Sequence, residues 1–382
     1  MITTLKVAHQ LSENSKNIRM NTLANESIAL LRRMIAVPST SFEEEQVCSL
    51  ISNQLTEWGI EHKVYGNNIV MFNKLYDSNL PTLALDAHID TVPAAASYSR
   101  NPFDSGEDEN VIYGLGSNDD GGSVVALIAV FRHFYEEKLP FNLCLTLTSE
   151  EERSGPNGAR WIYGKEGPFA EKLPEWTIIG EPTGMRAATS ERGLLVIDGE
   201  AVGVSGHAAR NEGVNALYIA MDDIQKLRNY RFSKVSPTMG EVKLSVTQVN
   251  AGTAHNVIPD KCTFVIDIRP TEQYENEEIL NELQSMCKST LKARNLANRS
   301  SATHVDSPLL KATEALGIET FSSPTTSNWM RINSDAIKMG PGESSRSHHA
   351  DEYILRSEIE SAIEKYIEYI NKLSGYRLLV VG

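Results

Sequence analysis

Apolar and polar positions follow helical spacing in the N-terminal part of the chain. Apolar residues recur at this spacing from Leu23 to Ile35 and again over residues 47–58, so the sequence predicts two helices that each bury one face. Ser41 and Glu44 have the S-x-x-E spacing of a capping box that would open the second helix, and Gly59 marks its end.

Short runs that are apolar at almost every position come next, and they predict strands buried on both faces. These runs are Thr82–Asp86, Phe141–Thr148 and Trp176–Ile179, with a helix over residues 123–136 between the first two. After Pro308 the alternation resumes with a helical stretch, a strand over 336–339 and a helix over 357–373. This alternation predicts an α/β fold in which a mostly parallel sheet is covered by helices on both faces.

A different order of elements lies between these two parts. Past Gly184 the pattern predicts the order βαββαβ, which is that of a ferredoxin-like domain. The six elements are expected at Leu194–Gly199, Val214–Arg228, Glu241–Val249, Cys262–Arg269, Asn276–Cys287 and Leu291–Asn295. We therefore expect an inserted domain over residues 186–304, within a larger domain formed by residues 1–185 and 305–382.

Charge and cysteine content exclude several classes of function. Among 382 residues, 36 Lys and Arg stand against 50 Asp and Glu, and the net charge of −14 argues against binding to nucleic acid or an anionic membrane. The cysteines Cys48, Cys144, Cys262 and Cys287 form no C-x-x-C pair, which is typical of free thiols in a reducing compartment. Residues 1–20 contain no long apolar segment, so we expect a frayed extension rather than a secretory signal, and a cytoplasmic protein.

Acidic residues and histidines lie just after the predicted strands of the larger domain or in the glycine-rich loop over 114–122. In chain order they are His88, Asp90, Asp119, Glu150, Glu151, Glu152, Glu181 and His348. Open α/β sheets bind ligands at the carboxyl ends of their strands, so these side chains can converge although they lie far apart in sequence. The loop itself matches neither nucleotide-binding glycine pattern.

Two imidazoles with several carboxylates form a ligand set for zinc, with cobalt or manganese as possible substitutes. Any one of these residues alone would more often be a surface carboxylate or a hydrogen-bonded histidine. Four strand ends that all carry ligand-type residues instead favour a metal site.

Five segments resemble the active-site motifs of the M20 family of zinc amidohydrolases and metallopeptidases, and they occur in the family's order. They are His88–Pro93, Gly114–Asp120, Ser149–Glu152, Gly180–Thr183 and His348–Glu352. The stretch from Gly340 to Tyr353, with G-P-G before the histidine and D-E-Y after it, is most similar to the acetylornithine deacetylase branch of the family.

The resemblance implies a ligand set for two zinc ions. Asp119 would bridge the ions, His88 and Glu181 would complete the ligands of one, and Glu152 and His348 those of the other. Two divalent cations and three carboxylates leave one positive charge for a bridging hydroxide to neutralise. Such a site generates hydroxide near neutral pH and polarises a carbonyl, as amide hydrolysis requires.

Two further carboxylates receive roles from the same resemblance. Asp90 would contact no metal but would orient the imidazole of His88 and raise its basicity. Glu151 would act as the general base, taking a proton from the water and delivering it to the departing amine. The spacing to Gly158 favours Glu151 as base and Glu152 as ligand, which leaves Glu150 as a support or a solvated residue.

Two other candidate residues have a neighbour of the same residue type, and a third position differs from the usual residue of the family. Asp120 is the alternative to Asp119, and His349 is the alternative to His348, although the H-x-x-D-E spacing favours His348. Many family members have a lysine where this chain has Gly121; glycine is compatible with a tight entry into the following helix.

The resemblance also implies substrate-binding residues. His207 would reach an active site, often that of the partner subunit in a homodimer formed through the inserted domain, and stabilise the oxyanion. Asn256 and Arg269 would bind a substrate carboxylate or carbonyl, since a guanidinium suits bidentate recognition. Arg346 would contact a substrate carboxylate or, equally, serve a surface role; Arg269 has the alternative of a surface arginine at a strand end.

We therefore expect a zinc-dependent hydrolase that cleaves N-acetyl-L-ornithine to L-ornithine and acetate in arginine biosynthesis. N-acetylcitrulline, N-succinylornithine and succinyl-diaminopimelate remain alternative substrates, and a di- or carboxypeptidase remains an alternative enzyme. A zinc-binding interaction protein without catalysis is disfavoured, because structural zinc sites need no spare carboxylate such as Glu151.

Overall fold

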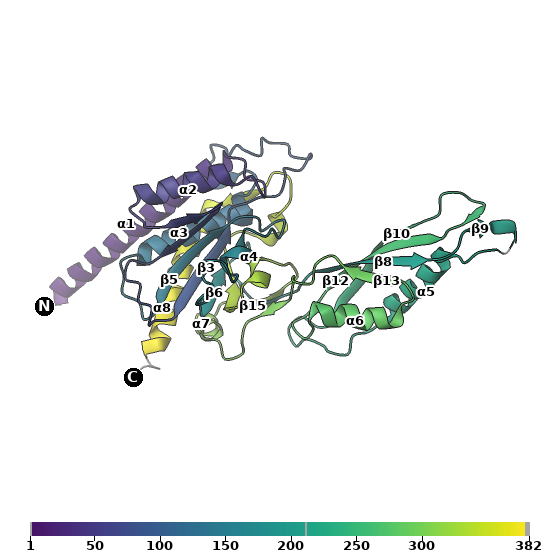
Figure 1. Ribbon diagram of the computed structural model, residues 1–382. Coiled ribbons are helices and arrows are strands. Elements are labelled where there is room, and N and C mark those ends of the chain that lie inside the picture. Colours follow the sequence, from purple (N-terminus) through teal and green to yellow (C-terminus); the bar gives the residue numbers. More distant parts are fainter. Residues whose placement is uncertain (1, 211, 379–382) are drawn as a thin grey trace. The chain divides into compact units, whose positions relative to one another are not determined.

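The computed structural model describes residues 2–210 and 212–378, with side chains between residues 18 and 375 apart from residue 211. Contacts divide the chain into two compact units (Figure 1). The first takes the residues up to Thr189, Thr303–Phe321 and those from Ser327; the second takes Ser190–Ala302 and Ser322–Thr326. The chain thus crosses between the units within a few residues of the boundaries expected from sequence, and the short segment 322–326 rejoins the second unit.

A nine-stranded sheet, which lies mainly in the first unit, has the order β1-β2-β5-β3-β6-β16-β7-β14, with β15 paired to β7. Its strands are β1 (Lys63–Tyr65), β2 (Asn68–Phe72), β3 (Thr82–His88), β5 (Asn142–Thr148), β6 (Trp176–Ile179), β7 (Ala187–Glu191), β14 (Ser301–Ala302), β15 (Thr320–Ser323) and β16 (Asp335–Lys338). The adjacent strands β5, β3, β6 and β16 are parallel. Every residue of β3 and β5 is buried, which explains why their sequences are mostly apolar.

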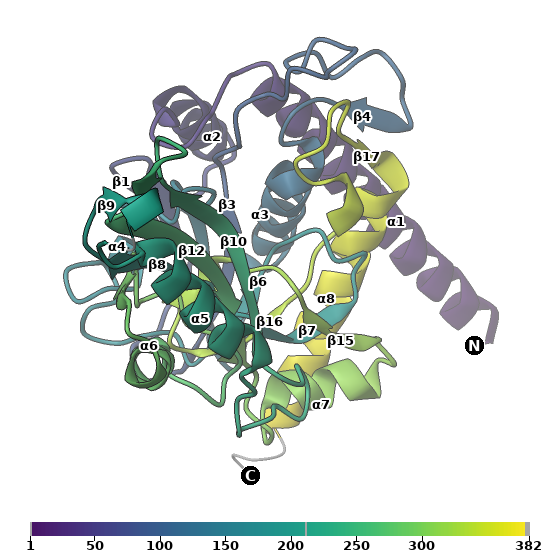
Figure 2. The same cartoon turned by 90° about the vertical axis from the view of Figure 1, so that its right-hand side faces the viewer.

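Helices cover both faces of this sheet. The helices of the first unit are α1 (Ile2–Ile35), α2 (Glu45–Glu57), α3 (Gly122–Phe134), α4 (Ala159–Ile162), α7 (Pro308–Ala315) and α8 (Arg356–Leu378). On one face, α3 packs on β3 and β5 and is covered by α1 and α8 (Figure 2). On the other face, α4 and the short turn η3 (Asn328–Arg331) enclose a second core around Trp329. The predicted α/β architecture is therefore confirmed.

The second unit contains a four-stranded antiparallel sheet in the order β10-β12-β8-β13. Its elements are β8 (Leu195–Val202), β9 (Gly206–His207), η2 (Ala208–Arg210), α5 (Ala216–Asn229), β10 (Lys243–Ala251), β11 (Val257–Ile258), β12 (Lys261–Arg269), α6 (Asn276–Met286) and β13 (Thr290–Ala293). Buried and less buried residues alternate along β8 and β12, and the buried face packs against α5 and α6. The four strands of this sheet and the two helices follow the βαββαβ order expected from the sequence.

Two expectations about the N-terminal part are wrong. The backbone is helical from Ile2 within α1, so residues 2–20 are not a frayed extension. The capping box is also absent from the described start of α2, because the side chain of its N-cap residue, Glu44, accepts no capping hydrogen bond. The Ser41 hydroxyl instead donates to Asp90 Oδ2 at 2.6 Å.

Within the described residues, no helix is both long enough and apolar enough to cross a bilayer.

Candidate metal and catalytic site

Neighbouring strands of the sheet bring the candidate residues together. His88 is the last residue of β3, and Asp90 follows it. The glutamates at 150–152 follow β5, and Glu181 follows β6. Since β5, β3 and β6 are adjacent and parallel, their carboxyl ends lie at one edge of the sheet. Asp119 reaches the same edge from the turn η1 (Ser117–Gly121) before α3.

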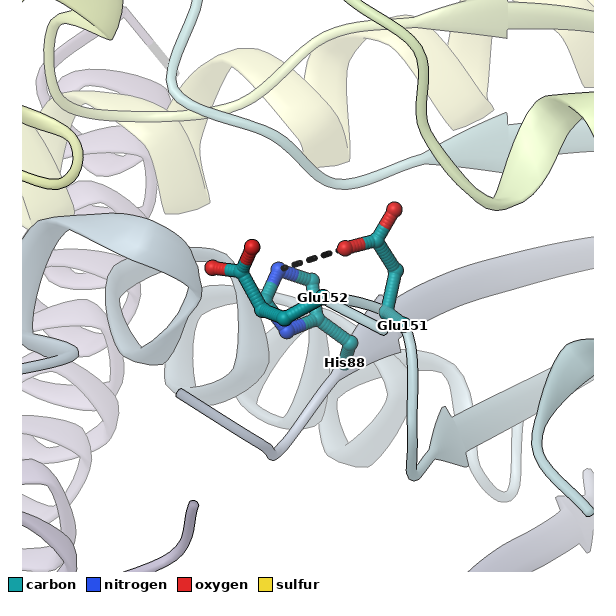
Figure 3. Close-up of side chains that lie close together, drawn as sticks. All are labelled: His88, Glu151 and Glu152. Atoms are coloured by element: carbon teal, nitrogen blue, oxygen red, sulfur yellow. Dashed lines mark ion pairs between the residues drawn. The ribbon is translucent and has the colours of Figure 1, made fainter. Parts of the chain in front are cut away.

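Five donor residues form two overlapping groups that could each hold a metal ion. His88, Glu151 and Glu152 make one group, and Asp119, Glu152 and His348 make the other, with the donor atoms of each group within 4.8 Å of one another. Figure 3 shows the first group, in which His88 Nε2 lies 4.0 Å from Glu151 Oε2. Glu152 belongs to both groups.

Asp119 lies between the two histidines. Its Oδ1 is 3.2 Å from His88 Nε2, and its Oδ2 is 3.8 Å from His348 Nε2. His348 Nε2 also lies 2.9 Å from Glu152 Oε1. A carboxylate with one oxygen toward each imidazole has the geometry needed to bridge two cations.

Glu181 is placed differently from the other expected ligands. It is half-buried and belongs to neither donor group formed by the described residues. Burial raises the pKa of its carboxyl well above the ordinary value; the charge of Lys338 opposes this shift, and the charges of Asp119 and Glu151 add to it. Its role as a ligand stays a prediction.

The crowding of carboxylates dominates the electrostatics of the site. Burial, together with the charges of Glu152, Asp90 and Asp119, raises the pKa of Glu151 well above the ordinary range. The hydrogen bond to Glu152 raises the pKa of His348 to about 9. Burial alone would lower the pKa of His88, but Asp119 and Asp90 raise it. So much negative charge in one place favours divalent cations, which would relieve the repulsion.

Asp90 orients His88 mainly through its backbone. His88 Nδ1 donates to the carbonyl oxygen of Asp90 at 3.0 Å, whereas the nearer carboxylate oxygen is 3.4 Å away. A carbonyl can only accept, so Nδ1 carries a proton, and Nε2 is the nitrogen that would bind a metal. The Asp90 carboxylate instead accepts the backbone N–H groups of Glu151 and Glu152 at 3.0 and 3.1 Å.

Each candidate residue has a neighbour of the same residue type, and the two have different surroundings in the structure. Glu150, at a φ of 61°, turns away and accepts the backbone and side-chain N–H groups of Asn157 at 2.9 and 2.8 Å, so it supports the loop. Asp120 is buried and accepts the backbone N–H of His88 at 3.3 Å. His349 is exposed and belongs to neither donor group.

Gly121 is enclosed on both sides. A Cβ atom there would lie 2.4 Å from the carbonyl oxygen of Gly116 and 2.6 Å from the Leu31 side chain. No side chain fits at this position without a shift of the neighbouring backbone, so the lysine of many family members has no equivalent here.

Sequence reasoning missed one residue that holds the site. Glu352 is buried, and its carboxylate accepts the backbone N–H groups of Gly116, Asn118 and Asp119 at 3.0, 2.8 and 2.8 Å. The signal for it was the D-E pair at the third and fourth positions after His348, whose spacing was used only to choose between two histidines.

Two expected substrate-binding residues lie side by side in the second unit. His207 pairs with Val257 between β9 and β11, and the carbonyl oxygen of the adjacent Asn256 accepts the N–H of Ala208 at 3.1 Å. Both side chains are exposed. Arg269 is the last residue of β12, whereas Asn256 lies before the first residue of that strand. The guanidinium of Arg269 donates twice to Asp267, at 2.9 and 3.2 Å.

Arg346 is engaged by its own unit. Its guanidinium donates to both carboxylate oxygens of Glu358 in α8, at 2.8 and 3.0 Å, and lies 4.4 Å from the ring centroid of Tyr353. These contacts anchor the short turn η4 (Ser344–Arg346) that precedes His348. A substrate carboxylate would have to compete with Glu358 for the same donors.

Comparison with known proteins gives consistent matches along most of the chain. The sequence model of the family described as "Peptidase family M20/M25/M40" matches residues 84–372. The acetylornithine deacetylase of Edwardsiella ictaluri is 28% identical over an alignment of 373 positions, gaps included, that covers 88% of this chain and 94% of that protein.

Solved structures share the fold. The aminopeptidase PepT of Bacillus cereus aligns with a TM-score of 0.72 at 15% identity, over 92% of this chain and 99% of that chain. The YXEP protein of Bacillus subtilis, described as a dinuclear metal binding peptidase, aligns with a TM-score of 0.67 at 18% identity, over 93% and 98% of the two chains.

Proposed function

The chain belongs to peptidase family M20/M25/M40 and is therefore a metal-dependent hydrolase, and we propose that it cleaves the amide bond of an N-acyl-L-amino acid. As substrate we propose N-acetyl-L-ornithine, which would yield L-ornithine and acetate in arginine biosynthesis. The observation that carries this choice is the similarity to an acetylornithine deacetylase along 94% of that protein's length.

The donor set fits a pair of divalent metal ions, for which we propose zinc, with cobalt or manganese as substitutes. Both donor groups consist of imidazole and carboxylate donors, which suit these ions. The two groups have Glu152 in common, whereas the proposed ligand set has Asp119 in common. His88 and Glu181 would hold one ion, Glu152 and His348 the other, and Asp119 both. When bound, the ions supply Lewis acidity, which polarises the amide carbonyl and lowers the pKa of water.

The chain's own residues would move the proton. Glu151 lies beside His88 and has a raised pKa, which suits a group that takes a proton from water and returns it to the departing amine. Asp90 would fix both partners, since it binds His88 through its carbonyl and Glu151 through its carboxylate.

The second unit would complete the site in a homodimer. We propose that His207 stabilises the negative charge that develops on the carbonyl oxygen, and that Asn256 and Arg269 bind the substrate; Arg346 would join them only by releasing Glu358. Exposed apolar side chains of this unit support an interface, among them Val202 at 67% and Tyr218 at 64% exposure. The four cysteines are free, which supports our proposal of a cytoplasmic location.

A panel assay tests the substrate. The zinc-loaded protein is offered N-acetylornithine, N-acetylcitrulline, N-succinylornithine and succinyl-diaminopimelate, and we expect the highest kcat/KM on N-acetylornithine. Preference for another member would change the substrate within the same class. Inactivity on all four, with hydrolysis of dipeptides, would replace the proposal by a peptidase.

One variant separates catalysis from metal binding. Glu151→Gln keeps the side-chain shape but removes the base, so we expect turnover to be lost while the protein retains its metal, measured by elemental analysis. The exposed Glu43→Gln is the matched control. Unchanged turnover in Glu151→Gln would refute the assignment of the base.

A further inference from the structure

A short segment before α2 packs against the end of β3. The N–H of Thr91 donates to the carbonyl oxygen of Ser39 at 2.9 Å, and the N–H of Ser41 donates to that of Thr91 at 3.2 Å. Ser41 and Glu44 of this segment are buried, and both precede the residues 84–372 that match the family. The N-terminal segment therefore lies directly beside Asp90.

Three successive backbone N–H groups after β5 are each accepted by a carboxylate. The N–H of Glu150 donates to Glu44 Oε1 at 3.0 Å. Those of Glu151 and Glu152 donate to the two oxygens of Asp90. Asp90 in turn accepts the Ser41 hydroxyl at 2.6 Å. Glu44 thus binds the backbone of the turn formed by residues 150–152 directly, and Ser41 supports that turn through Asp90.

Helix α2 does not account for the burial of Glu44. Its side chain is fully buried, yet it forms no cap for α2. Its other partners are the N–H of Phe42 at 2.8 Å and the side-chain N–H of Asn67 at 3.0 Å. A buried carboxylate is costly unless its oxygens are hydrogen-bonded, and here these two groups and the N–H of Glu150 supply the hydrogen bonds.

The turn that Glu44 holds needs external support. Glu150 has a φ of 61°, a left-handed conformation that residues other than glycine rarely adopt. Three consecutive glutamates also repel one another, and the two that follow Glu150 both belong to the donor group of His88. Backbone hydrogen bonds to fixed acceptors oppose both tendencies.

We propose that Glu44 and Ser41 are positioning residues, which fix the backbone from which Glu151 and Glu152 project into the metal site. The activity readout of this proposal rests on the proposed function, but its metal-binding readout does not.

The two oxygens of Glu44 allow a discriminating pair of variants. Glu44→Gln keeps Oε1, which accepts the N–H groups of Phe42 and Glu150, and Asn67 can turn its amide to meet the new donor. Glu44→Ala removes all acceptors. A positioning role therefore predicts that glutamine rescues the site and alanine does not, whereas a need for the charge predicts that both fail.

The experiment uses the full chain loaded with Co²⁺, whose visible spectrum reports ligand geometry. In Glu44→Ala we expect metal affinity and kcat to fall by about 10- to 100-fold, as for other groups that orient ligands, with KM nearly unchanged. The cobalt spectrum should also change. Glu44→Gln and the exposed control Glu43→Ala should match the wild type.

Several results would overturn the proposal. They are a folded Glu44→Ala with wild-type affinity, spectrum and kcat, or a Glu44→Gln as impaired as Glu44→Ala. If Glu44→Ala does not fold, Ser41→Ala carries the test: it removes a single hydrogen bond and should change the spectrum and lower kcat, and a wild-type result would refute the role. Inactivity of the wild type on every substrate would refute only the proposed function.

Discussion

Replacing Glu352 should release the loop that carries Asp119. Its buried carboxylate accepts three backbone N–H groups, with Oε1 serving Asn118 and Asp119 and Oε2 serving Gly116. Hydrogen bonds to a charged acceptor contribute about 1.5–3 kcal/mol each, and buried donors left without partners are costly. Because the loop can relax and admit water, we expect Glu352→Ala to lower the free energy of unfolding by about 3–5 kcal/mol rather than the full sum.

The glutamine variant should have a smaller effect of a definite kind. In Glu352→Gln one oxygen still accepts Asn118 and Asp119, but the amide would present its own N–H groups to Gly116. One hydrogen bond is therefore lost and one buried donor is left unpaired, which costs about 1–3 kcal/mol.

Metal affinity should also change. Since Asp119 shifts with the loop, metal affinity should fall by about 10- to 100-fold in the Glu352→Ala variant.

Urea unfolding of the metal-free proteins, followed by circular dichroism, measures the first effect, and zinc titration measures the second. Asp351→Asn is the matched control, because the neighbouring carboxylate binds the N–H groups of Ser99 and Arg100, which belong to a different loop. Wild-type unfolding and wild-type zinc affinity in Glu352→Ala would refute the reasoning.

Three further predictions concern a metal ligand, the tight turn and the second unit. His348→Ala should leave one bound metal equivalent instead of two after dialysis, because the imidazole belongs to only one donor group; elemental analysis that still finds two would contradict this. Gly121→Ala should lower stability by about 1–3 kcal/mol in thermal unfolding through overpacking against Gly116 and Leu31, and an unchanged Tm would show that the turn has room. Burial raises the pKa of Asp223, but hydrogen bonds from Ser289 and Lys226 outweigh it and lower the pKa overall. Its stabilising effect is therefore present above the unfolded pKa near 4 and lost as the pH falls below it, so Asp223→Asn should flatten the loss of stability in acid measured by urea unfolding at several pH values.

The sequence predicted the central strands because burial on both faces leaves a one-dimensional signature. The runs that became β3, β5, β6 and β16 are apolar at most positions, and the structure places all four next to one another. That arrangement also made the convergence of His88 and Glu152 predictable, since parallel neighbours end at one edge.

Other features depend on contacts that no local pattern records. The edge strand β1 and its neighbour β2 are short, and they are placed by tertiary pairing, since β1 pairs with β2 and β2 pairs with β5. Ser41 and Glu44 have the spacing of a capping box, but their partners are Asp90 and Glu150, which come from the ends of two other strands. The sequence has the spacing of a capping box, but both side chains form tertiary hydrogen bonds instead of capping the helix.

The carboxylates around the site divide into two kinds according to what neutralises them. Asp119, Glu151 and Glu152 point their oxygens at one another and at the histidines, so only cations or protons can relieve their charge. Those of Asp90, Glu44 and Glu352 accept backbone N–H groups, which stabilise charge without competing for the same ions. Each carboxylate of the second kind holds the backbone of a residue of the first kind or of its immediate neighbour. The carboxylates of the second kind therefore keep those of the first kind close together, and this crowding of negative charge would favour the binding of divalent ions.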